Sequence, residues 1–165
     1  MTMPTHKLPY FGEIDFDEAK DHYLANCEID DRKINLHLFL KDNPLSTKRL
    51  DAVTNILNHL EELNKQNKNY IRADFNNEGE ALGHVQFYME ELEDELEQFV
   101  DTNKSEIPQL QLLNKLQLKV IFIQCEDDFE ATFDYALYFD GKASNQVLGV
   151  KLNADKSLKR ISWES

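Results

Sequence analysis

The side chains with the greatest potential for chemistry are carboxylates crowded into one segment. The stretch MEELEDELEQF, residues 89 to 99, places six acidic residues among the eight positions from Glu90 to Glu97. A hard-cation site needs about six to eight oxygens that converge from a folded loop, whereas carboxylates that point outward from a straight helix do not converge. The run therefore predicts a solvated helix face or a docking surface for a basic partner, and no metal site. The predicted partner-binding residues are Glu90, Glu91, Glu93, Asp94, Glu95 and Glu97.

Two histidines form the second candidate. His22 and His37 lie in two segments of alternating polarity that Asp30 and Asp31 join in a turn. Closing a hairpin there pairs His22 with Phe39 and puts both histidines diagonally on the outer face. They are the candidate pocket residues for a small-molecule or enzyme site on the sheet face, although ordinary surface histidines fit the same pattern.

A search for catalytic motifs finds none. The chain has no zinc-protease HExxH, no GxSxG and no phosphate-binding loop, and its five glycines lie too far apart to cradle a phosphate. The tail from Asn153 approaches a calcium loop, but Leu158 stands where the sharp turn needs glycine. The sequence therefore predicts no catalytic residue, metal or cofactor, and it favours a protein without enzymatic activity.

Composition narrows the class of partner. The chain has 165 residues, with 31 acidic and 18 basic side chains and a formal net charge of −13. Such a charge repels phosphate backbones and anionic membranes and suits a basic protein partner. Aromatic residues near the C-terminus are therefore assigned to the core and not to a nucleic-acid stacking surface. Cys27 and Cys125 are expected to be buried thiols. Without a secretion signal or an apolar stretch of about 18 residues, a cytoplasmic location is expected.

The periodicity predicts the elements that must position these residues. An α+β domain is expected over residues 1–165, with residues 1–9 loose. It has a single antiparallel sheet of five to six strands, with three to four helices inserted after the second strand and packed on one face. The first helix begins at a Ser46 cap, carries an apolar stripe to Leu63 and ends at NKQNKN. The other expected helices are 70–75, 80–101 and 108–116, and the later strands are LKVIFIQC, EATFDYALYF, QVLGVKL and LKRISW.

Two parts of the sequence are similar to a known family. LPYFGEID at residues 8 to 15 and FDYALYF…VLGVKLNADKSLKRISWES at the C-terminus resemble the bacterial domain of unknown function two-thousand-four, and LNKQNKNYIRADF fits the same style. The resemblance implies a small cytoplasmic bacterial protein with no assigned activity, and it supplies no catalytic residues.

The sequence thus favours a non-catalytic protein-interaction module with an acidic docking face, for example an immunity-type inhibitor of a basic partner. The alternative is a small-molecule-binding protein or enzyme whose site lies on the sheet face.

Overall fold

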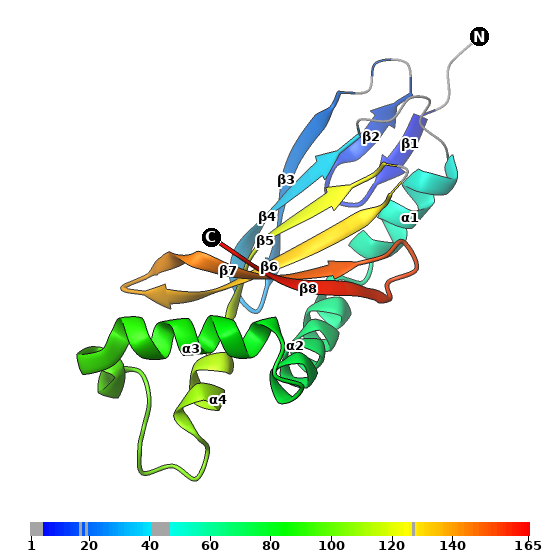
Figure 1. Cartoon of the computed structure of the whole chain (residues 1–165). Coiled ribbons are helices and arrows are strands. Elements are labelled where there is room, and N and C mark those ends of the chain that lie inside the picture. The colour runs from blue at the N-terminus through cyan, green and yellow to red at the C-terminus, as the bar shows by residue number, and fades with distance from the viewer. Residues whose placement is uncertain (1–4, 17, 19, 41–46, 127) are drawn as a thin grey trace.

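A small hairpin precedes a six-stranded sheet whose strands lie side by side in chain order. The computed structural model describes residues 5–16, 18, 20–40, 47–126 and 128–165. In Figure 1 the helices gather below and to the right of the large sheet. The strands are β1 (Thr5–Leu8), β2 (Gly12–Asp15), β3 (His22–Ile29), β4 (Arg32–Phe39), β5 (Gln117–Gln124), β6 (Glu130–Phe139), β7 (Lys142–Leu152) and β8 (Leu158–Glu164). The helices are α1 (Thr47–Leu57), α2 (Leu60–Asn76), α3 (Glu80–Leu92), the 3-10 helix η1 (Glu93–Gln98) and α4 (Pro108–Leu113).

The α+β class is confirmed, but the expectation of a single antiparallel sheet is wrong in two respects. Strands β1 and β2 pair with each other as a separate two-stranded sheet. Strands β4 and β5 pair in parallel, with Asn35 opposite Val120, because the helices between them carry the chain back to the same end of the sheet. The helices do follow the second strand of the large sheet, which is the fourth strand of the chain.

The N-terminal segment is more ordered than expected. Residues 1–4 of the predicted loose segment lie outside the described residues, but Thr5–Leu8 form β1. Leu8 and Ile14 are almost fully buried, and β1 packs against α1. Burial of these two side chains anchors the hairpin. The sequence did not predict this, because the segment is short and contains two prolines.

The register of the β3–β4 hairpin is confirmed. His22 lies opposite Phe39 and Cys27 lies opposite Ile34. Asp30 and Asp31 both have positive φ, 54° and 60°, so the two-residue turn has the twist that fits flanking strands. Aspartate tolerates this conformation better than most residues, which explains how the turn forms without glycine.

The helix boundaries differ from those expected. Ser46, the expected cap, lies outside the described residues. Helix α1 ends at Leu57, and the polar run NKQNKN lies inside α2 and does not end a helix. Asn64 and Asn67 within this run are buried, so they share the inner face of α2 with apolar residues. The separate helix expected at 70–75 is therefore the last part of α2, and the helix expected at 108–116 ends at Leu113.

The core lies between the large sheet and the helices. Phe133 and Tyr135 of β6 are fully buried, which confirms that these aromatic residues belong to the core. Cys27 and Cys125 are buried and free of disulfides, as expected. In the described part of the chain, no helix combines the length and the apolarity needed to cross a membrane.

Candidate functional site

The acidic run forms a corner and not one straight helix. The helix expected over 80–101 ends at Leu92, since Glu93 adopts φ 11° and ψ −86°. The chain then continues as η1, whose first turn holds Glu93, Asp94 and Glu95. Negative side chains are favoured near a helix N-terminus. The break therefore places three of the acids at the start of a new helix, where their charges are less unfavourable than at the end of a long one. We call Glu90, Glu91, Glu93, Asp94, Glu95 and Glu97 the acidic corner.

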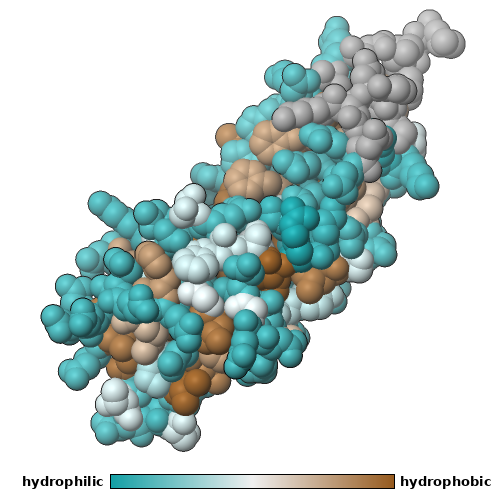
Figure 2. Space-filling view, viewed as in Figure 1, coloured by the Kyte–Doolittle hydropathy of each residue, from teal (hydrophilic) through white to brown (hydrophobic). Residues whose placement is uncertain are grey.

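The acidic corner is exposed and carries uncompensated charge. All six side chains are exposed, and no ion pair with another described residue reaches them. In Figure 2, hydrophilic groups protrude from this end of the molecule, with hydrophobic patches between them. Leu92 alone in this stretch is buried, and it fixes the corner to the core. The corner therefore presents a concentrated negative field to solvent.

The face of the large sheet that points away from the helices carries the two candidate histidines. His22 Nε2 lies 3.0 Å from His37 Nδ1, and the rings stack with centroids 5.1 Å apart. Phe39 stacks on His22, and Phe122 lies against His37. Burial lowers the pKa of His37, and His22 lowers it further. The expected placement of both histidines on one outer face is confirmed.

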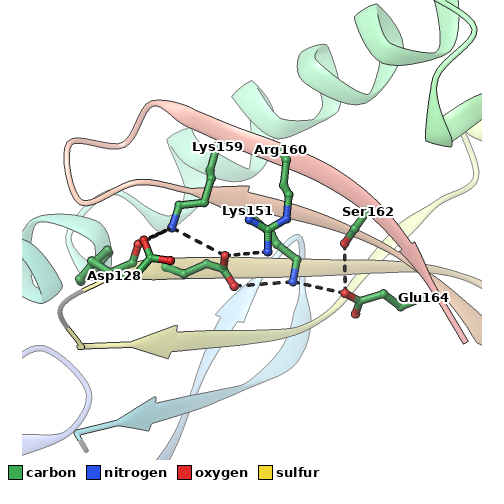
Figure 3. A network of polar contacts seen from close by, with 8 residues as sticks. Asp128, Lys151, Lys159, Arg160, Ser162 and Glu164 are labelled. Carbon is green, nitrogen blue, oxygen red and sulfur yellow. Dashed lines mark hydrogen bonds and ion pairs between the residues drawn. The ribbon is translucent and has the colours of Figure 1, made fainter. Parts of the chain in front are cut away.

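A charged cluster lies further along the same face, on β6, β7 and β8. Figure 3 shows the basic side chains of Lys151, Lys159 and Arg160 close together. The carboxylate of Glu130 lies among them. Its oxygens lie 3.6 Å from Lys151, 3.7 Å from Lys159 and 3.1 Å from Arg160. Lys159 also binds Asp128 at 2.9 Å. The side chain of Glu130 is only 12% exposed, so this is a partly buried ion network, in which removal of one charge is costly.

A bulge in β8 makes the cluster possible. Lys151 lies opposite Arg160, but the next residue of β7, Leu152, lies opposite Leu158. Lys159 is therefore the extra residue, and a bulge lets two successive side chains approach the same side of a sheet. Without it, Lys159 would point to the opposite face from Arg160.

Asp134 is the most perturbed acid of this face. Its Oδ1 is buried without a hydrogen-bond partner among the described residues. Burial, and after it the carboxylate of Glu164, raise its pKa to about 6 against the opposing effects of Lys151 and Lys119. A Cβ on Gly149 would lie 3.1 Å from this oxygen, so glycine leaves room for the carboxyl group. Titratable groups with such pKa values can exchange protons near neutral pH.

Sequence reasoning missed this charged cluster. Its signal was the alternation of Glu130, Thr132 and Asp134 with the apolar residues of β6, which places these three polar side chains on one face of the sheet. The burial of that face could not be predicted, because a strand buried on both faces normally has a continuous apolar run. The histidines and the acidic corner do not come together, since they lie on different elements. Across the described residues, no set of three or more metal-binding side chains is placed to hold a metal ion.

The fold and these surfaces define an α+β protein with a mixed six-stranded sheet, one face of which has no described helix over it. The chain belongs to DUF2262, a family of uncharacterized proteins conserved in bacteria, whose family model matches residues 9–160. The resemblance to domain of unknown function two-thousand-four is therefore wrong, because the family model that matches the chain is a different one. No curated protein and no solved structure matches the chain.

Proposed function

We propose that this protein is a non-catalytic interaction module that binds a basic protein through the acidic corner. The observation that carries the proposal is the six exposed carboxylates without an ion pair to another described residue. An immunity-type inhibitor of a basic partner is one concrete form. The formal net charge of the whole chain, −13, also favours a basic partner.

The physical advantage of such a corner is kinetic. Complementary charge raises association rates by about 10 to 1,000-fold at low salt, and added salt screens the effect. Because the acids are anchored by the buried Leu92, the partner would meet them in a fixed arrangement. We therefore expect binding that weakens steeply as ionic strength rises.

Neutralising the acidic corner tests the proposal. A variant with its five glutamates changed to glutamine and Asp94→Asn should lose a basic protein that the wild type captures from native-host lysate at low salt. With that protein purified, its association rate should fall roughly tenfold or more. The measurement is stopped-flow binding at two salt concentrations.

A matched control removes the same charge elsewhere. It carries glutamine or asparagine at six other exposed acids, and it should bind like the wild type. Those acids are Glu28, Asp31, Glu61, Glu62, Glu80 and Asp140. An equal loss of binding in both variants would mean that binding depends on the overall charge and not on the acidic corner. Unchanged binding in both variants would refute a docking role for the corner.

A small-molecule site on the sheet face is the second candidate. The contact between His22 and His37 supports it, because His22 Nε2 and His37 Nδ1 lie 3.0 Å apart, so that one of them donates a hydrogen bond to the other according to the tautomers of the two rings. Phe39 and Phe122 extend this strip with apolar surface. A flat ligand that stacks on the rings and accepts or donates one hydrogen bond fits these features.

Imidazole NMR signals test this second candidate. In a screen of flat aromatic compounds, a ligand of the sheet face should shift the signals of His22 and His37. His59, which lies in the turn between α1 and α2, provides the internal control. A compound that shifts all three signals alike, or a screen without shifts, would remove the sheet face as a ligand site.

A further inference from the structure

A cleft on the helix side of the sheet has the lining of a ligand site. It has a volume of about 290 Å³ and lies between α2, the connection from α4 to β5, and β6. Its volume is near the lower end of the range of about 300–1,000 Å³ that small-molecule sites have. Ile71, Leu113 and Leu116 provide apolar walls. None of its lining residues belongs to the acidic corner or to the open sheet face.

The mouth of the cleft is basic in a strongly acidic protein. Lys68 and Arg72 both line it and stand one turn apart on α2. Arg72 donates a hydrogen bond of 2.8 Å to the neutral amide of Asn114, and no ion pair with another described residue neutralises it. Lys68 meets Asp30 only at 3.5 Å, with both side chains more than half exposed. Like charges one turn apart on a helix repel each other, and an anion bound between them would relieve that repulsion.

A second, smaller hollow adjoins the first and adds a third cation. It shares Lys68 and Leu116 with the cleft and is also lined by Arg32. Arg32 is held in place, since its Nη1 donates to the carbonyl of Leu118 at 2.7 Å. Its guanidinium also lies 4.6 Å from the ring centre of Tyr138. The acids that border this region are Asp30, in the smaller hollow, and Glu106, which accepts a hydrogen bond from Asn114 at 3.2 Å.

The floor of the cleft is polar where a core is normally apolar. Tyr135 lines it although its side chain is fully buried, and its hydroxyl donates to Asn64 Oδ1 at 2.7 Å. Burial raises the pKa of Tyr135, so the hydroxyl stays protonated. The Asn67 side chain, buried on the inner face of α2, interacts with the Tyr135 hydroxyl and opposes the effect of burial on its pKa. The inner end of the cleft therefore carries a polar group beside its apolar walls.

We propose that this cleft binds a small organic oxyanion, a carboxylate or phosphate group on a compact apolar body. Lys68 and Arg72 hold the anionic group at the mouth, where the planar guanidinium can donate two parallel hydrogen bonds to it. The apolar body lies against Ile71, Leu113 and Leu116. A polar atom at the inner end faces the Tyr135 hydroxyl.

The test titrates three probes into the full-length protein labelled with ¹⁵N. Phenyl phosphate and benzoate carry the two anionic groups on the same ring, and benzyl alcohol is their neutral counterpart. Both anions, or one of them, should shift the backbone amides of residues 68–72 and 113–117 with saturation. The tighter of the two identifies the natural group as phosphate or carboxylate. Equal binding of benzyl alcohol, shifts scattered over the surface, or no shifts at millimolar concentration would each overturn the proposal.

Charge variants separate specific recognition from general attraction. The double variant Lys68→Gln with Arg72→Gln should weaken anion binding at least about tenfold, as expected for the loss of charge-assisted hydrogen bonds. The control is Lys65→Gln with Lys142→Gln, which removes two exposed lysines outside the cleft and should leave binding within about twofold. Similar binding in both variants would overturn the proposal.

Discussion

Glu130→Gln should lower the free energy of unfolding by about 3 kcal/mol, the lower end of the range for breaking a buried ion pair. The substitution keeps the shape of the side chain but removes the negative charge that Lys151, Lys159 and Arg160 share. The lysine side chains are only 12% and 16% exposed, so water replaces the lost carboxylate poorly. The loss stays near the lower end because Glu164 and Asp128 still pair with them. Urea unfolding at pH 7 measures it.

The control for this prediction is Asp128→Asn. Asp128 pairs with Lys159 at 2.9 Å, but its side chain is 92% exposed, and exposed pairs contribute little. We expect a clearly smaller loss than for Glu130→Gln. Similar losses in the two variants would mean that the network is effectively solvated, and the argument for a partly buried cluster would fail.

Asp134→Asn should change how stability depends on pH. The pKa of Asp134 is about 6 in the folded protein, against about 3.9 in an unfolded chain. Between these values the folded state holds a proton that the unfolded state has released, so stability falls as pH rises from about 4 to 6. A shift of about two pKa units corresponds to about 3 kcal/mol, which partial solvent screening lowers to about 2 kcal/mol. The asparagine variant should not show this loss of stability between pH 4 and 6.

Urea unfolding at a series of pH values between 4 and 8 measures this difference. Relative to the wild type, Asp134→Asn should gain about 2 kcal/mol from pH 4 to pH 7.5. Thr132→Val is the control, because Thr132 is buried on β6 beside Asp134 but carries no titratable group, so the profile of this variant should run parallel to that of the wild type. A parallel profile for Asp134→Asn as well would show that its carboxyl group titrates normally.

Local sequence patterns predicted the individual strands of the large sheet well and the helices less well. The alternation in residues 22–40 determined the hairpin register correctly, since period-two burial leaves one consistent pairing. The strand EATFDYALYF was located with its observed bounds. The parallel pairing of β4 with β5 could not be predicted, because it depends on how the helices return the chain. The continuity of α2 was missed because Asn64 and Asn67 read as a polar break, whereas tertiary contacts bury them.

The candidate sites that depend on local strand pairing could be predicted from the sequence, and those that depend on long-range contacts could not. The contact between His22 and His37 follows from local register, so sequence could find it. The acidic run was found, but its bend at Glu93 was not, since helix periodicity continues through Leu96 and Phe99. The ion cluster needs β6, β7 and β8 in register plus one bulge. The basic cleft is lined by residues of α2 and β6 that lie more than sixty positions apart in the sequence, from Lys68 to Tyr135. No local sequence pattern reveals contacts between residues so far apart.

The bulge at Lys159 also bears on self-association. β8 is an edge strand of the large sheet, and a regular edge offers unpaired backbone groups to another molecule. An extra residue twists the edge locally, and the cationic side chain of Arg160, which is 53% exposed, discourages a second strand from approaching. The irregularity that collects positive charge around Glu130 therefore also protects this edge against aggregation.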